Sequence, residues 1–326
     1  MPWRRIAYPE TPADRIASAA LLPLSWLYGL GWRSYEAVYR VGLKRRRSFD
    51  LPIVGVGNLT VGGSGKTPVV AELVRLANKA GISPALSLSG YGSPSASTTT
   101  VLLPADTVDA GKHGDEPAEI RRRLPSTPLI IGRDRVAAAE AASDFECLIL
   151  DDGFQHLPLA RKADLVLWDD DAPNKRLLPA GPLREPNSGI RRATAVATPN
   201  RAPAGYGGNV FHFEREYLHL RDIATDETLP LAWLRGKQVD ALCAIARPDR
   251  FFAALRELGA DVRTARALGD HDPIEATQSS DVPTIVTEKD ATKIAATPGQ
   301  FFSLVMRIRF TEEEAVVAWL TKNLSR

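Results

Sequence analysis

The sequence predicts an α/β protein with a mostly parallel, doubly wound sheet, followed by a second, smaller α/β domain. From residue 51 to residue 198, short apolar runs typical of buried strands alternate with runs of helical periodicity, and the alternation resumes after residue 236. Residues 202–208, between these regions, are rich in proline, glycine and alanine. We therefore expect an N-terminal helical segment at 1–47, a core domain at 48–205, a β linker at 206–235 and a C-terminal domain at 236–326.

The core domain is expected to begin with a strand at 51–57, Leu-Pro-Ile-Val-Gly-Val-Gly, which carries no charge, as a strand buried on both faces requires. The later apolar runs have the same character, and the segments between them place apolar residues at helical spacing. The further strands expected are 84–89, 128–131, 146–150, 164–168 and 195–198, and the helices are 68–80, 116–124 and 133–142.

The region after residue 208 begins differently. Residues 209–220 alternate between polar and apolar side chains, which predicts one or two antiparallel strands. Thr311, with Glu314 three residues later, predicts a capping box at the start of a last helix. Between them we expect strands at 239–246, 261–267, 284–287 and 301–309, and a helix at 249–258.

Composition limits the class of protein and its partners. Of the 326 residues, 44% are hydrophobic and 25% are charged, which is typical of a globular protein. The net charge of +2 is too small to favour nucleic acid, so we expect no nucleic-acid partner. We also expect the protein to be a monomer. Cys147 and Cys243, the two cysteines, lie in apolar runs, which indicates buried thiols in a reducing compartment.

The N-terminal segment combines an uncharged stretch with flanking cations. No charged residue occurs from Ile16 to Trp32, but Pro23, Ser25 and Gly29 interrupt this stretch, and a membrane-spanning helix needs about 20 mostly apolar residues. Arginines, lysines and aromatic residues surround it, as at an anionic lipid surface. We expect either a peripheral membrane anchor or a helix packed on the protein's own core, and both can hold on different faces.

Residues 58–67, Asn-Leu-Thr-Val-Gly-Gly-Ser-Gly-Lys-Thr, have the composition of a phosphate-binding loop, or P-loop, between a strand and a helix, so the predicted fold is P-loop NTPase-like. Glycines let backbone N–H groups point at phosphate oxygens, Lys66 supplies an ammonium, and Thr67 supplies a hydroxyl for Mg²⁺. The general pattern has glycine at position 60, so a simple glycine-rich turn is the alternative. The expected nucleotide-binding residues are Asn58, Thr60, Gly62, Gly63, Ser64, Gly65, Lys66 and Thr67.

A second apolar strand ends in two carboxylates. Residues 148–150, Leu-Ile-Leu, run into Asp151 and Asp152, an arrangement that places a Walker B aspartate beside the Mg²⁺ held by Thr67. An exposed turn after a buried strand is the alternative. Gln155 supplies a further polar group near the same strand end.

Two more polar clusters offer candidate acid–base groups. Asp115 and Glu116 open a predicted helix, and an aspartate near a γ-phosphate can accept the proton of an attacking hydroxyl. Acidic residues are also common at ordinary helix N-termini. His271, between two aspartates in the second domain, could share a proton with a catalytic carboxylate, and a surface turn is the alternative there.

Seven segments together resemble the tetraacyldisaccharide 4'-kinases, the lipid A 4'-kinases of Gram-negative bacteria. They occur in the expected order over nearly the whole chain, and the P-loop segment includes the threonine that departs from the general pattern. The segments are 56–68, 114–117, 151–156, 177–185, 246–252, 270–271 and 287–290.

The resemblance implies transfer of the γ-phosphate of ATP, with Mg²⁺, to the 4'-hydroxyl of a tetraacylated glucosamine disaccharide 1-phosphate at the cytoplasmic face of the inner membrane. It implies that the C-terminal domain closes the active-site cleft. Lys66 would hold the β- and γ-phosphates, and Asp115 would be the base, assisted by His271. Thr67, Asp151 and Asp152 would serve Mg²⁺, and the residues that would support the metal and phosphate network are Glu116, Gln155, Arg184 and Glu185.

The chain departs from the family at Ser89, where an arginine is usual, and at Asp272, where a second histidine is common. Two other classes of function stay open. A P-loop GTPase of the metal-delivery or regulatory type usually carries Asn/Thr-Lys-x-Asp after a late strand, but residues 174–177 lack the aspartate and residues 287–290 have the wrong spacing. A non-catalytic nucleotide-binding scaffold would leave the candidate carboxylates without a purpose.

Overall fold

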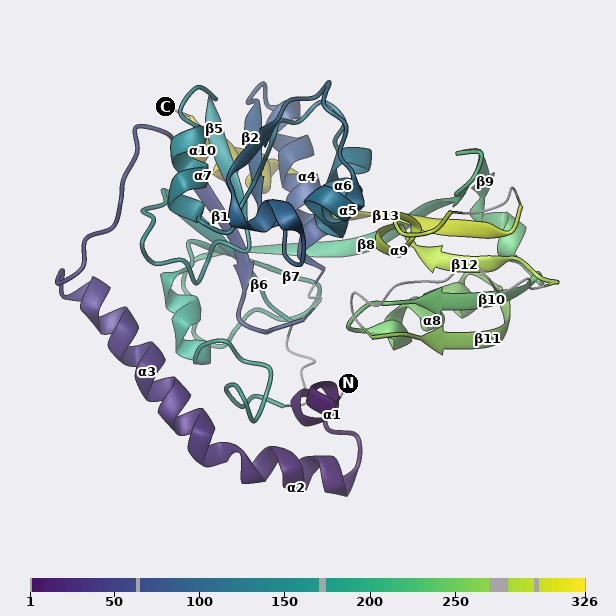
Figure 1. Cartoon of the computed structure of the whole chain (residues 1–326), viewed down its shortest axis with the longest axis horizontal. Coiled ribbons are helices and arrows are strands. Elements are labelled where there is room, and N and C mark those ends of the chain that lie inside the picture. The colour runs from purple at the N-terminus through teal and green to yellow at the C-terminus, as the bar shows by residue number, and fades with distance from the viewer. Residues whose placement is uncertain (1, 63–64, 170–173, 270–280, 296–298, 326) are drawn as a thin grey trace.

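The computed structural model describes residues 2–62, 65–169, 174–269, 281–295 and 299–325 (Figure 1). Its strands are β1 Ile53–Asn58, β2 Pro84–Leu88, β3 Thr100–Leu102, β4 Leu129–Ile131, β5 Cys147–Asp151, β6 Ala163–Leu167, β7 Ala195–Thr198, β8 Asn209–Asp222, β9 Thr228–Pro230, β10 Gln238–Cys243, β11 Asp261–Ala267, β12 Thr284–Thr287 and β13 Phe301–Phe310. They form one sheet in the order β11-β10-β12-β13-β8-β7-β6-β1-β5-β2-β4-β3, with β9 paired to β8. The described pairings are parallel except β3–β4, β8–β13 and β8–β9. The predicted α/β class with a mostly parallel sheet is confirmed.

The helices are α1 Pro2–Ala7, α2 Pro12–Ala20, α3 Leu22–Arg40, α4 Lys66–Lys79, α5 Ala110–His113, α6 Asp115–Arg123, α7 Arg135–Ala141, α8 Pro248–Glu257, α9 Glu288–Ala291 and α10 Glu313–Leu324. Helices α4 and α10 cover one face of the sheet and α7 covers the other, because successive residues of a strand point to opposite faces. Val54 and Val56 of β1 join the core that contains α4 and α10. Ile53 of β1 lies on the opposite face and belongs to a separate core with Ala138 and Ala139 of α7.

Two long strands connect the two parts of the sheet. The first residues of β8 pair with β7, residues 213–222 pair antiparallel with β13, and β13 then pairs with β12. Figure 1 shows β8 and β13 running from the part that contains β1 to the part that contains β10 and β11. The second part has its own apolar core, to which Val239, Phe252 and Phe302 contribute. Residues 206–235, expected to form a β linker, therefore contain a strand in the middle of the sheet.

The predicted capping box of the last helix is wrong. The N-cap of α10 is Glu312, and no side chain caps this helix. Instead, a carboxylate oxygen of Glu312 accepts a hydrogen bond from the backbone N–H of His212 at 2.8 Å, and the other lies 2.9 Å from His212 Nδ1. A tertiary contact with β8 thus takes the place of the local one at Thr311.

The N-terminal helices rest on the loop formed by residues 174–184. Ser18 Oγ donates to the carbonyl of Ala180 at 2.6 Å, and Ser25 Oγ donates to the carbonyl of Leu177 at 2.9 Å. Gly29 lies so close to Leu177 that a Cβ would approach its side chain to 2.7 Å. The predicted helical segment thus packs on the protein along a stripe of small residues.

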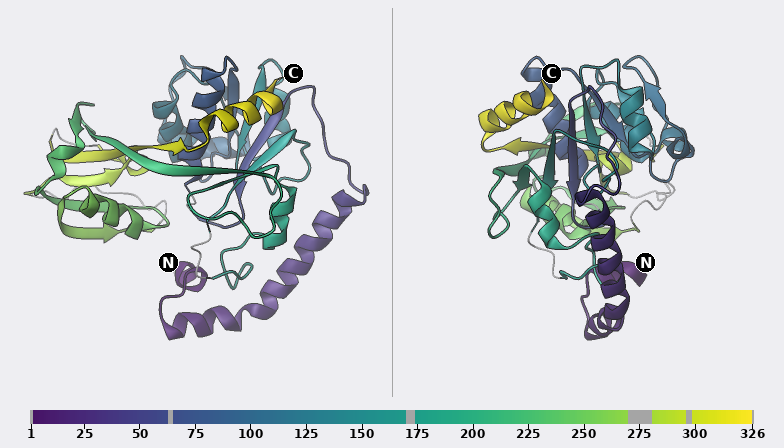
Figure 2. Two further views of the ribbon diagram at one scale, coloured as in Figure 1. Left: turned by 180° about the vertical axis from the view of Figure 1, so that it is seen from behind. Right: turned by 90° about the vertical axis from the view of Figure 1, so that its left-hand side faces the viewer.

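The other side of α2 and α3 faces solvent. Figures 1 and 2 show the two helices as an arm along one edge of the protein. Within the described ranges, no helix has the length and apolar character needed to cross a membrane. The large apolar side chains exposed on or just after this arm are Ile16, Leu24, Trp26, Leu27, Leu30, Val41 and Leu43.

Candidate active site

The P-loop leaves the carboxyl end of β1 and leads into α4, between the strands β5 and β6 that flank β1. Gly62 and Gly65 have φ values of +94° and +77°, a region that side chains disfavour, so glycine is required at these turns. Lys66 and Thr67 form the start of α4, where backbone N–H groups and the helix dipole favour an anion. Gly63 and Ser64 lie outside the described residues.

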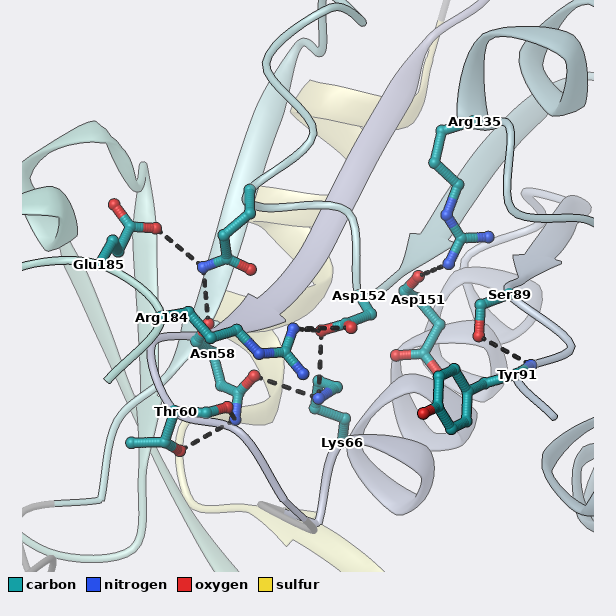
Figure 3. A network of polar contacts seen from close by, with 11 residues as sticks. Asn58, Thr60, Lys66, Ser89, Tyr91, Arg135, Asp151, Asp152, Arg184 and Glu185 are labelled. Carbon is teal, nitrogen blue, oxygen red and sulfur yellow. Dashed lines mark hydrogen bonds and ion pairs between the residues drawn. The ribbon is translucent and has the colours of Figure 1, made fainter. Parts of the chain in front are cut away.

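Thr60, which replaces the first glycine of the general pattern, takes part in a local network (Figure 3). Asn58 Nδ2 donates to the Thr60 carbonyl at 2.8 Å and to its hydroxyl at 3.1 Å. The Asn58 carbonyl oxygen in turn accepts a hydrogen bond from Gln155 at 2.9 Å. The threonine therefore stabilises the loop by a side-chain contact that glycine cannot make.

Lys66 and Arg184 converge on Asp152. Lys66 Nζ lies 3.1 Å from both Asn58 Oδ1 and Asp152 Oδ1, and Arg184 Nη1 lies 2.8 and 2.7 Å from the two oxygens of Asp152. Burial opposes ionisation of Asp152, but the two cations outweigh it and hold its pKa well below the usual value. Asp152 is thus an anion at neutral pH, and it orients the P-loop ammonium.

Asp151, next to it, has the opposite electrostatics. It ends β5 with only 4% of its surface exposed, and burial together with the nearby Glu116 raises its pKa to about 7. Its Oδ1 atom is buried and has no hydrogen-bond partner among the described residues. Arg135, which sequence analysis missed, donates to the backbone carbonyl of Asp151 and to Ser87. An orphaned carboxylate oxygen beside Lys66 is the donor that a hard divalent cation requires.

Glu185 has a different environment from the metal-supporting one expected. It is fully buried, and its two oxygens accept hydrogen bonds from Gln155 Nε2 at 2.8 Å and from Arg192 Nη2 at 2.7 Å. Arg192 also donates to Glu36 of α3 at 2.8 Å and lies over the ring of Phe154, 4.6 Å from its centroid. With both oxygens occupied, Glu185 positions Gln155 and links the P-loop to α3.

The candidate base begins α6. Asp115 Oδ2 lies 2.9 Å from Nζ of Lys293, a residue that follows α9 and that sequence analysis missed. Glu116, the second residue of α6, is half-buried and close enough to Asp151 to raise its pKa. His271 lies outside the described residues. Among those residues, no group of three or more His, Cys, Asp or Glu side chains gathers as a metal site.

Comparison with known proteins identifies the family. The family model for tetraacyldisaccharide-1-P 4'-kinase matches residues 17–325. This chain belongs to the tetraacyldisaccharide-1-P 4'-kinase family.

Individual members of the tetraacyldisaccharide-1-P 4'-kinase family match over most of their length. The tetraacyldisaccharide 4'-kinase of Delftia acidovorans is 37% identical over 90% of this chain and 87% of its own, and that of Geobacter sulfurreducens is 38% identical over 90% of both. A crystal structure of LpxK from Aquifex aeolicus in complex with ATP matches with a TM-score of 0.81 and 28% identity, covering 94% of this chain and 99% of that chain. The resemblance inferred from the sequence is therefore confirmed, together with the kinase class that it implies.

Proposed function

We propose that this chain transfers the γ-phosphate of ATP to the 4'-hydroxyl of a tetraacylated glucosamine disaccharide 1-phosphate, a step of lipid A biosynthesis. The observation that carries the proposal is the P-loop ammonium of Lys66, held between Asn58 and Asp152 in a chain of the 4'-kinase family. The relatives' names supply the acceptor, and the neighbouring structure's ATP supplies the donor.

The residues that a GTPase would use to read guanine are engaged elsewhere. Asn174 is buried, and its Nδ2 donates to the carbonyls of Ala180 at 2.9 Å and Ile6 at 3.1 Å. Asp290 is also buried, and its Oδ2 accepts hydrogen bonds from the Thr287 hydroxyl and the Ala244 N–H. Because both side chains serve the fold, they favour the kinase over the GTPase alternative.

The site fits a nucleotide with Mg²⁺. The start of α4 and Lys66 would hold the β- and γ-phosphates, while Thr67 and the unpartnered Oδ1 of Asp151 would hold Mg²⁺. Bound there, Mg²⁺ would neutralise charge on the transferring phosphoryl group. Asp152 would act through its contacts with Lys66 and Arg184, and Glu116 would tune Asp151.

The chain's own residues would perform the transfer as follows. Asp115 would accept the proton of the 4'-hydroxyl as its oxygen attacks the γ-phosphorus, and the bond from that phosphorus to the bridging oxygen would break to release ADP. Lys66 and Arg184 would stabilise the charge that develops on the phosphate oxygens. His271 would assist Asp115 from the part of the chain after β8, a C-terminal domain that would close the cleft.

The N-terminal arm would bring the enzyme to its substrate. A tetraacylated lipid stays in the bilayer, because each buried methylene contributes about 0.8 kcal/mol. The apolar side chains exposed on α2 and α3 and the exposed cations that follow, from Arg40 to Arg47, suit an anionic lipid surface. We infer peripheral association with the cytoplasmic face of the inner membrane.

A product assay tests the proposal. Incubation with Mg²⁺, the tetraacylated disaccharide 1-phosphate and either ATP or GTP should add one phosphate to the lipid, and should do so much faster with ATP. Fragmentation of the product by tandem mass spectrometry should place the new phosphate on the distal sugar. No gain in mass, or a clear preference for GTP, would contradict the proposal.

A further inference from the structure

Lys293 links the far part of the sheet to the candidate base. Its Nζ atom lies 2.9 Å from Asp115 Oδ2, although the two residues are 178 positions apart in the sequence. Asp115 lies in the segment between β3 and β4, and Lys293 lies in the segment between β12 and β13. Asp115 is the first residue of α6, and Lys293 follows α9, which packs against α6 and leads on from β12. The side chains of Lys293 and Asp115 are only 11% and 20% exposed.

The pair is not arranged as an optimal salt bridge. A lysine ammonium carries three N–H donors. Nζ of Lys293 is buried, and none of its donors makes an aligned hydrogen bond to a residue that the structure describes. A buried ammonium that makes no aligned hydrogen bond to the described residues adds little stability through them, so we look for its role in the contact with Asp115.

The contact between α6 and α9 already has its own ion pair. Arg123 at the end of α6 lies 2.6 Å from Glu288 at the start of α9, and it also pairs with Glu119 at 3.0 Å. Arg123 further donates to the carbonyl of Met306 in β13. Lys293 is therefore not needed to hold the two helices together, and its distinguishing feature is its contact with Asp115.

We propose that Lys293 is a positioning residue for Asp115: its ammonium, 2.9 Å from Oδ2, holds the carboxylate in the orientation that faces the acceptor hydroxyl. The inference rests on the proposed role of Asp115 as the base. The ammonium attracts the carboxylate oxygen that lies 2.9 Å away and so limits the orientations of the Asp115 side chain. A base displaced by about 1 Å can lose two orders of magnitude in rate.

A double-mutant cycle tests this with the full-length enzyme. Lys293→Met keeps the length of the side chain and removes the charge, and we expect kcat to fall about 10- to 100-fold with the KM for ATP changed less than about twofold. In the Asp115→Asn background, the same change should cause no further loss, because Lys293 would have no carboxylate to position. Lys322→Met, an exposed lysine on α10, is the matched control and should leave kcat unchanged.

Chemical rescue tests whether the loss of kcat comes from the missing ammonium rather than from the changed side-chain shape. Lys293→Cys, treated with bromoethylamine, regains an ammonium on a side chain of nearly the same length, and its mass verifies the modification. Cys147 and Cys243 are 0% exposed whereas the side chain at position 293 is 11% exposed, so labelling favours position 293. We expect most of the lost kcat to return.

The outcomes separate the two hypotheses. If Asp115→Asn leaves turnover unchanged, the proposed base is wrong. If Asp115→Asn lowers turnover to a small residual rate but Lys293→Met does not lower kcat, lowers it by the same factor in the Asp115→Asn background, or is not rescued by the restored ammonium, the role of Lys293 is wrong while the proposed function stands.

Discussion

Lys66 Nζ and Asp152 Oδ1 lie 3.1 Å apart, so the ammonium of the P-loop is held by a carboxylate that follows the next strand of the sheet. The strands β1 and β5 are adjacent and parallel, and their carboxyl ends meet at the same edge. This adjacency brings Lys66 and Asp152 together from positions 86 residues apart, and it follows from the fold rather than from either motif alone.

Replacing Lys66 should therefore remove most of the activity. Lys66→Met eliminates a charge that would stabilise the transferring phosphoryl group, and we expect kcat/KM for ATP to fall about 100- to 1,000-fold. Lys79→Met, an exposed lysine at the other end of α4, is the control and should change kcat/KM less than about twofold. Steady-state kinetics provide the measurement, and equal activity of both variants would contradict a P-loop role for Lys66.

Asp151 should make the stability of the metal-free protein depend on pH. Its pKa is raised from 3.8 to about 7, mainly by burial. Between pH 4 and pH 7 the unfolded chain has released a proton that the folded protein retains, so the free energy of unfolding falls as the pH rises, and the loss is complete above pH 7. The contribution is on the order of 4 kcal/mol.

The variant Asp151→Asn isolates this effect. Urea unfolding in the presence of a chelator at pH 5, 6 and 8 should show the wild-type protein losing stability relative to Asp151→Asn as the pH rises. A difference between the two proteins that is constant over this range would show that Asp151 does not titrate there.

The buried pair of Arg192 and Glu185 should be important for stability. Arg192→Met leaves the carboxylate of Glu185, which is fully buried, without its guanidinium, and breaking such a pair costs about 3–5 kcal/mol. The exposed neighbour Arg191→Met is the matched control, with an expected effect below about 0.5 kcal/mol. Denaturant unfolding measures both, and similar stabilities for the two variants would refute the role assigned to Arg192.

The exposed apolar face of α3 should bind the membrane surface. Trp26, Leu27 and Leu30 are 64–70% exposed and lie away from the residues that pack on the protein. Changing all three to serine should reduce binding to anionic vesicles about 100-fold or more, at about 1.5–3 kcal/mol for each side chain that the bilayer would fully bury. The double variant Val101→Ser/Leu103→Ser, exposed apolar residues elsewhere, should sediment with vesicles as the wild type does, whereas equal loss in both variants would contradict a role for α3.

The sequence predicts those parts of the site that are contiguous in the chain. The P-loop, the Asp151 and Asp152 pair and the position of Asp115 at a helix start follow from local patterns of strand, glycine and carboxylate. Thr11 and Asp14 form the capping box of α2, and their spacing, with Pro12 at the first helical position, is a local pattern of the same kind.

The remaining residues could not be found in this way. Arg135 begins α7, Arg192 ends a short 3-10 helix and Lys293 follows α9, so each contacts the site from another element and no local pattern marks it. At Thr311, a tertiary contact between Glu312 and His212 overrode a local signal. The sequence predicts that Glu185 supports the metal and phosphate network. In the structure its two oxygens instead accept hydrogen bonds from Gln155 and Arg192, which lie elsewhere in the sequence.

The most direct test of the account is the position of a bound nucleotide. A crystal structure with Mg²⁺ and a non-hydrolysable ATP analogue should show the triphosphate on the backbone amides of residues 58–67, with Lys66 Nζ within hydrogen-bond distance of a β- or γ-phosphate oxygen. An analogue bound elsewhere, with Lys66 still paired only with Asn58 and Asp152, would contradict the account.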